Sequence, residues 1–272
     1  MITNNMMAKA NNIVEIIKDN GYDATYDVVN KNGVYIISVA IGSGNVRPSI
    51  PIDKDKLENH SEEEIAENII RIYEKNKDVD NGIMDLAEMF SDYEKIKGMV
   101  IPYLCKGEMP DAVSRKYLDL NVYYRVVSGD MSILVLNKHL EAWDITEDEL
   151  YIQAIRNVKD DFIAEDIEDM LPFIGSMKGL LYCVHRTDNI YGSAALLLPE
   201  LFDQFISEDN CPVVIIPSSI HEVLVVGKST PEINFITDMI KSVNQTTVDP
   251  KDVMSDHAYV YINGEIKEAE ND

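Results

Sequence analysis

The sequence repeatedly places a pair of β-rich segments before an amphipathic helical segment, and this order constrains its fold more than any other feature. The first pair is residues 24–29 and 34–41, which are rich in β-branched and aromatic side chains. Between them, Asn32-Gly33 supplies the positive backbone angles that a tight hairpin turn needs. Because hairpins rather than single strands alternate with helices, we predict an α+β fold of repeated antiparallel β-hairpin plus helix units.

Similar helix starts follow the predicted hairpins. Residues 61–64 (Ser-Glu-Glu-Glu) and 146–149 (Thr-Glu-Asp-Glu) each place a hydroxyl three residues before a glutamate, which is the pattern of a helix capping box. The second box follows a second predicted hairpin, residues 118–127 and 133–136, with its turn at Gly129-Asp130. This repetition indicates either a duplicated unit or only a shared architecture.

A third unit is predicted to begin with strand-like residues 180–186. A second strand is expected at 194–198, and paired strands are expected within residues 213–226. We therefore predict two or three subdomains on a shared core. The predicted division is an N-terminal α+β subdomain, residues 1–95, and a C-terminal α+β subdomain, residues 96–272.

The charge of the chain limits its partners. Lys and Arg number 24 against 48 Asp and Glu, so the net charge is -24, and such a surface repels phosphate backbones. We therefore expect no direct binding to nucleic acid. The acidic side chains that we predict to bind a basic protein partner lie in one stretch: Glu147, Asp148, Glu149, Asp160, Asp161, Glu165, Asp166, Glu168 and Asp169. The alternatives are a solvated face that only keeps the chain soluble and a surface that mimics nucleic acid.

Compartment and membrane association are also predicted from the sequence. The first residues lack a basic region followed by an apolar stretch, and no run reaches the roughly 18 apolar residues needed to cross a bilayer. The cysteines Cys105, Cys183 and Cys211 show no C-x-x-C spacing, which disfavours a disulfide framework and a zinc site. We expect a cytoplasmic protein with no membrane contact. Its oligomeric state is not predicted.

Common cofactor and metal motifs are not present in the sequence. Gly42-Ser-Gly44 begins a dinucleotide fingerprint, but Arg47 stands at the third glycine position. His221-Glu222 begins a zincin pattern, but Val225 stands where the second histidine belongs. No P-loop and no nucleophile elbow occurs. We therefore predict no cofactor and no metal.

Residues 217–222 (Pro-Ser-Ser-Ile-His-Glu) form the densest polar group between apolar strand-like runs, and Ser219 and His221 within them are the candidate catalytic residues. On a continuous strand these two side chains would share one face about 6.6 Å apart. Glu222 would point to the other face, so a distant acid would have to orient His221 in a hydrolase. The structural alternative, which we favour, is a turn or bulge at residues 217–219 with His221 linking strands or packing on the sheet.

Several segments resemble a known bacterial family. Residues 118–126, 137–143, 192–199 and 216–223 resemble the family called domain of unknown function 5688, seen mainly in clostridial genomes. The last segment is the most specific, and the resemblance covers roughly residues 60–265. It implies no known activity, so it assigns no role to any residue.

Together these features predict a non-catalytic intracellular binding or interaction protein that uses its acidic surface. The first alternative is a hydrolase centred on Ser219 and His221, and the second is an acidic nucleic-acid mimic. A carboxylate within hydrogen-bond reach of His221 inside a cleft would favour the hydrolase.

Overall fold

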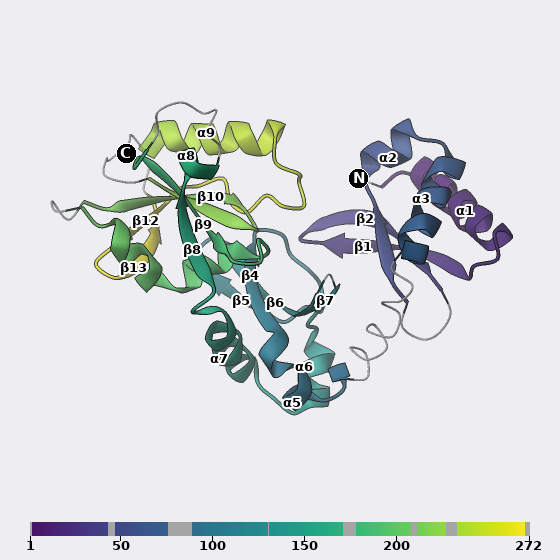
Figure 1. Cartoon of the computed structure of the whole chain (residues 1–272), viewed down its shortest axis with the longest axis horizontal. Coiled ribbons are helices and arrows are strands. Elements are labelled where there is room, and N and C mark those ends of the chain that lie inside the picture. Colours follow the sequence, from purple (N-terminus) through teal and green to yellow (C-terminus); the bar gives the residue numbers. More distant parts are fainter. Residues whose placement is uncertain are drawn as a thin grey trace. The chain divides into compact units, whose positions relative to one another are not determined.

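The chain folds into two compact units, Met1–Lys95 and Ile96–Asp272, and each contains helices and antiparallel sheet (Figure 1). In a computed structural model, the described residues are 2–42, 47–75, 89–129, 131–170, 178–207, 211–226 and 233–269. Their strands form three antiparallel sheets, of three, four and six strands. The predicted α+β class is therefore confirmed. Within those ranges, no helix is long and apolar enough to cross a membrane.

The first unit packs two long helices against the three-stranded sheet. In order, it contains α1 (Asn4–Asp19), β1 (Ala24–Lys31), β2 (Val34–Ile41), β3 (Ser49–Ile52), α2 (Lys54–Asn59) and α3 (Glu62–Lys75). Asn32 and Gly33 both have positive φ at the predicted hairpin turn. The predicted capping box is also present, because the Glu64 amide donates to the Ser61 hydroxyl and the Glu64 carboxylate accepts from the Ser61 amide.

The four-stranded sheet begins the second unit. After α5 (Tyr93–Ile96), the elements are η2 (Lys97–Met99), β4 (Val100–Cys105), β5 (Ser114–Tyr117), β6 (Leu120–Ser128), β7 (Met131–Leu134), α6 (Asn137–Trp143) and α7 (Glu147–Val158). Strand β6 is central, and it pairs with β4, β5 and β7. It begins two residues later than predicted because Leu118, with a φ of 54°, lies in the turn after β5. The predicted turn residue Asp130 lies outside the described residues.

The six-stranded sheet has the order β13-β12-β10-β11-β9-β8. Its elements and those between them are β8 (Phe162–Asp166), α8 (Ile167–Met170), β9 (Leu181–Arg186), η3 (Gly192–Leu197), η4 (Pro199–Phe205), β10 (Val213–Ser219), β11 (Glu222–Val226), α9 (Ile233–Thr246), β12 (Tyr259–Ile262) and β13 (Glu265–Glu268). Helix α9 covers one face of this sheet, where Ile236 and Ile240 join a core cluster with Val214 and Ile216 (Figure 1).

The strand predicted at residues 194–198 is wrong, because residues 194–197 belong to the 3-10 helix η3 and Leu198 is its C-cap. All residues of η3 are buried, and an apolar run without alternating polar residues does not distinguish a strand from a buried helix. The helix connects both sheets of the second unit. The Leu104 amide of β4 donates to Ser193 Oγ at 2.9 Å. The Gly192 and Ser193 amides donate to the carbonyl oxygens of His221 and Ile220 at 2.9 and 3.2 Å.

Candidate functional site

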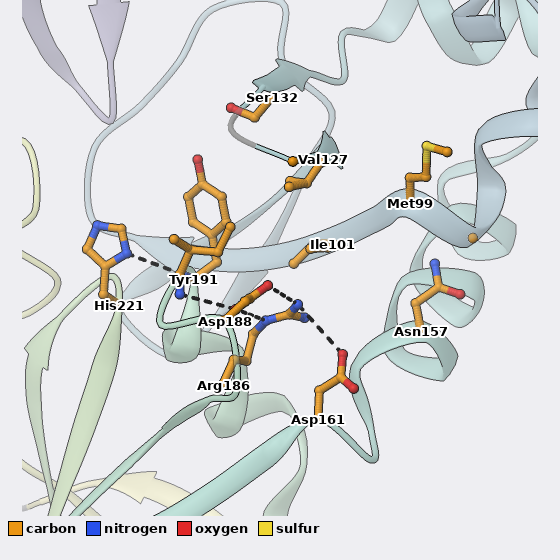
Figure 2. A pocket seen from close by; sticks show the side chains of 13 residues that line it. Met99, Ile101, Val127, Ser132, Asn157, Asp161, Arg186, Asp188, Tyr191 and His221 are labelled. Carbon is orange, nitrogen blue, oxygen red and sulfur yellow. Dashed lines mark hydrogen bonds and ion pairs between the residues drawn. The ribbon is translucent and has the colours of Figure 1, made fainter. Parts of the chain in front are cut away.

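A cavity of about 700 Å³ lies in the second unit between residues of its two sheets (Figure 2). The four-stranded sheet and η2 supply most of its apolar wall, and the end of β9 with the following loop supplies most of its charged groups. The lining residues are Gly98, Met99, Ile101, Val127, Gly129, Ser132, Asn157, Asp161, Arg186, Asp188, Ile190, Tyr191 and His221. The cavity therefore combines an apolar side with a polar, charged side.

Arg186 is the most deeply buried charged residue of the cavity, with 4% of its surface exposed. Its Nε and Nη2 donate to the two Asp188 oxygens at 3.1 and 2.7 Å, and Nη2 lies 3.6 Å from Asp161 Oδ2 (Figure 2). Its remaining nitrogen, Nη1, is buried and finds no acceptor among the described residues. Arg125 Nε is a second buried nitrogen without an acceptor in the described part of the chain, and such a donor is unfavourable by about 1–3 kcal/mol.

Asp188 orders the loop that follows β9. Its Oδ1 accepts from the Ile190 amide at 3.2 Å as well as from Arg186. Burial alone would raise the pKa of Asp188, but the hydrogen bonds from Arg186 and Ile190 outweigh it and hold that pKa below its ordinary value. Asn189 and Tyr191 have φ of 60° and 55°, so the loop turns sharply before η3.

Tyr191 forms part of the cavity wall and stacks with other aromatic rings. Its ring lies 4.8 Å from the Tyr103 ring and 5.9 Å from the His221 ring. The Arg125 guanidinium lies 5.8 Å from the Tyr191 ring centroid and 5.7 Å from that of Tyr103, within range of a cation–π contact. Arg125 Nη1 also donates to Ser132 Oγ at 2.9 Å. A second guanidinium is therefore held close to the cavity without lining it.

The Asn157 side chain has all of its main hydrogen-bonding groups occupied by the protein. Its amide nitrogen donates to the carbonyl oxygens of Lys97 and Val100 at 2.6 and 2.9 Å, and its oxygen accepts from Gln153 at 2.6 Å. Asn157 therefore fixes η2 to α7, and both hydrogens of its side-chain amide are used within the protein.

His221 lines the cavity with 34% of its side chain exposed. The Tyr191 amide donates to Nδ1 at 3.3 Å. Since a backbone N–H only donates, Nδ1 carries the lone pair and the proton of the neutral ring belongs on Nε2. Nε2 lies 4.0 Å from Asp252 Oδ1, beyond hydrogen-bond distance. The His221 ring therefore has no lone pair available to take a proton from a nucleophile.

The structure places Ser219 against main-chain and carboxylate groups. Its hydroxyl donates to Glu222 Oε1 at 2.8 Å and accepts from the His221 amide at 3.0 Å, and Ser218 also donates to Glu222 Oε1, at 2.9 Å. The pairing of β10 with β11 shifts register between Ile216 and Ser219. This irregularity agrees with the predicted turn or bulge. In the described part of the chain, no hydrogen bond joins Ser219 Oγ to the His221 ring.

The first three predicted binding acids lie in the first turn of α7. Glu147 makes a bidentate contact with Arg115 and accepts from the Tyr124 hydroxyl. Asp148 also contacts Arg115, although 81% of its side chain is exposed. Glu149 closes the predicted capping box with the residue before the helix. Glu147 and Asp148 therefore fix α7 to the four-stranded sheet, whereas Glu149 caps the helix itself.

The other predicted binding acids lie farther along the chain. Asp161 lies beside Arg186 in the cavity, and Glu165 Oε2 lies 2.9 Å from the buried His185 Nε2. Asp166 accepts from the amides of Gly179 and Glu168 at 2.6 and 3.0 Å. Asp160 has 86% of its side chain exposed. Glu168 and Asp169 lie in the first turn of α8.

Arg186, Asp188 and Tyr191 are site residues that the sequence analysis missed. The available signal is weak: an arginine ends a β-rich apolar run and is followed two residues later by an aspartate. Nothing in that spacing predicts the cavity, because the opposite wall comes from residues 98–132. Within the described residues, no group of three or more His, Cys, Asp or Glu is arranged to hold a metal ion.

Comparison with known proteins adds one match. A family model described as a family of unknown function (DUF5688) matches residues 4–263. No curated protein and no solved structure matches the chain. The comparison therefore gives the site no residue roles.

Proposed function

The chain belongs to the DUF5688 family of unknown function, and we propose that it is a non-catalytic binding protein that holds a small, largely apolar molecule in the cavity of its second unit. One observation carries this proposal: an apolar wall and a small group of polar side chains, among them Arg186 and Asp188, line one cavity. Small-molecule sites are typically cavities of about 300–1,000 Å³ with apolar walls and a few convergent polar groups. The volume of about 700 Å³ falls in this range.

A hydrolase centred on Ser219 and His221 is the second candidate. It is favoured by the presence of His221 in the cavity and of Asp252 4.0 Å from its Nε2. The hydrogen bond from the Tyr191 amide to Nδ1 argues against it, because general-base catalysis needs that lone pair. Ester hydrolysis lost in both Ser219→Ala and His221→Gln would support the hydrolase.

The predicted basic protein partner stays a prediction. Glu147 and Asp161 each lie within ion-pair distance of an arginine of the same chain, so much of their charge is already compensated. Asp148 and Asp160 have 81% and 86% of their side chains exposed, so they would be among the first to meet a basic surface. The cavity supports the proposed binding function more directly than this divided set of acids.

Binding in the cavity is tested with Nile red, a neutral dye whose fluorescence rises in apolar surroundings. We expect saturable binding with one site per chain. Val127→Trp, which adds volume to the β6 side of the cavity, should weaken binding at least tenfold. Phe235→Ser is the control, because Phe235 is 67% exposed on α9 and offers the dye an alternative apolar surface.

The two variants separate a cavity from a surface site. Binding that survives Val127→Trp but is lost in Phe235→Ser would place the dye on α9 and contradict the proposal. Absence of saturable binding by the unmodified chain would contradict it as well.

A further inference from the structure

The loop before η3 has an unfavourable backbone conformation where it forms the cavity wall. Tyr191 has a φ of 55°, a left-handed conformation that is uncommon for a bulky side chain. Its ring lines the cavity and lies 4.8 Å from the Tyr103 ring. Because such a conformation persists only while surrounding groups hold it, the contacts of Tyr191 decide the shape of this wall.

Hydrogen bonds tie this loop and the start of η3 to the β10–β11 turn. The amides of Gly192 and Ser193 donate to the carbonyl oxygens of His221 and Ile220 at 2.9 and 3.2 Å. The Tyr191 amide donates to His221 Nδ1 at 3.3 Å, and Figure 2 shows this bond beside the cavity. A carbonyl oxygen accepts at any pH at which the chain is folded, but an imidazole nitrogen accepts only while it carries no proton. Of these three bonds, the one to Tyr191 is therefore the one that a change of pH can break.

The charges around the His221 ring include an acceptor for its protonated form. Nε2 lies 4.0 Å from Asp252 Oδ1, so a ring that gains a proton on Nδ1 is attracted to this carboxylate. The other carboxylates around the ring and the cavity also favour a charged ring, and the two arginines oppose it. The further titratable side chains around the ring and the cavity are Tyr103, Arg125, Asp161, Arg186, Asp188, Tyr191 and Glu222.

From this geometry we infer that His221 is a pH-dependent switch of the cavity wall: the neutral ring holds Tyr191 in place, and the protonated ring releases Tyr191 and turns to Asp252. The inference rests on the proposed function and adds the regulation of that same site. In the held state Nδ1 accepts an N–H, so this state excludes a proton from Nδ1. Acid pH therefore favours the released state, in which the Tyr191 backbone can relax and its ring no longer completes the wall.

Nile red titrations at pH 8.0 and pH 5.5 test the switch, because histidines change charge in this range while most carboxylates stay ionised. We expect the dissociation constant of the unmodified chain to be at least threefold higher at pH 5.5. His221→Gln can offer the Tyr191 amide a side-chain oxygen that accepts at both pH values, so its two dissociation constants should agree within about 1.5-fold.

His139→Gln is the matched control. His139 Nδ1 also accepts from a backbone amide, that of Leu136 at 3.0 Å, but His139 belongs to α6 and lies outside the residues that line the cavity. This variant should keep the threefold difference between the two pH values.

Amide NMR follows the switch without a ligand. Between pH 8.0 and pH 5.5, the Tyr191 amide proton of the unmodified chain should move upfield, as expected for an amide that loses its acceptor. The Ser193 amide, whose acceptor is a carbonyl oxygen, should move much less. In His221→Gln, neither resonance should move appreciably.

The outcomes distinguish this inference from the proposed function. Equal dissociation constants of the unmodified chain at both pH values would overturn the inference and leave the cavity as a binding site. A difference that persists in His221→Gln, or that is lost in His139→Gln, would overturn it as well. If Nile red binds at neither pH, the proposed function is overturned, and the Tyr191 resonance then decides the switch: equal movement in the unmodified chain and in His221→Gln would overturn it.

Discussion

Gly192 lies where η3 meets two strands of the six-stranded sheet, and Gly192→Ala tests how closely the second unit is packed there. An added Cβ would lie 2.1 Å from the carbonyl oxygen of His221 and 3.1 Å from the Cα of His185. Both obstacles belong to the backbone, so no side-chain rotation relieves the overlap. The chain can accept alanine only if η3 and the β10–β11 turn move apart.

The expected loss of stability follows from the contacts that would break if η3 and the β10–β11 turn moved apart. The amides of Gly192 and Ser193 donate to the carbonyl oxygens of His221 and Ile220. Two such hydrogen bonds contribute about 1 kcal/mol each. Overpacking of a buried site adds about 1–3 kcal/mol. We therefore expect Gly192→Ala to lower the free energy of unfolding by about 3–5 kcal/mol, a large part of the 5–15 kcal/mol that is typical of native proteins.

Urea denaturation followed by the fluorescence of Trp143 measures this change. Trp143 is the only tryptophan of the chain, and it is buried in α6 of the second unit. Gly98→Ala is the matched control, because Gly98 lies in the same unit and its added Cβ would meet nothing within 4 Å. We expect the control to change the free energy of unfolding by less than about 0.5 kcal/mol. Equal midpoints for the two variants would refute the packing argument.

Two further predictions concern ion pairs of the second unit. Glu147→Gln should lower the free energy of unfolding by about 2 kcal/mol, since Glu147 is bidentate with Arg115 and accepts from Tyr124. Asp148→Asn, at an exposed side chain, should change it by less than about 0.5 kcal/mol. Equal effects of the two variants in urea denaturation would contradict this difference. Asp188→Asn should be less stable than the unmodified chain at pH 7. The fold lowers the pKa of Asp188, so its contribution to stability is present above its unfolded pKa of about 3.9 and is lost as the pH falls through its folded pKa. The urea midpoints of the two chains should therefore converge below about pH 4. A difference that stays constant from pH 7 to pH 3 would count against the Arg186–Asp188 pair as its source.

Features fixed by local chemistry could be predicted from the sequence. The turn at Asn32-Gly33 and the capping boxes at residues 61–64 and 146–149 depend on groups within four residues of one another, and all three are confirmed. Strand β4 was not predicted because Pro102 lies in its middle, although an edge strand accepts proline. Its six residues are all buried, so no alternation with polar residues marks it as a strand.

The candidate site was predicted only in part, because its walls come from segments that lie far apart in the sequence. His221 stands out in the sequence because polar residues surround it between apolar runs, and the structure places it in the cavity. Arg186 and Asp188 look like a strand end and a turn, and they become site residues only when β4 and β6 pack opposite them. Which residues pack across from a given residue depends on the tertiary fold, and the alternation pattern of a single strand does not predict them.

The attachment of η3 to both sheets does not depend on the side chains that shape the cavity. Its links to β4 and to the β10–β11 turn use main-chain groups and the small Ser193 hydroxyl. Exchanging Met99 or Ile190, which line the cavity without taking part in those links, would alter the interior surface while the backbone scaffold kept its dimensions. Two chains that share this scaffold can therefore present cavities of different shape without any change of topology.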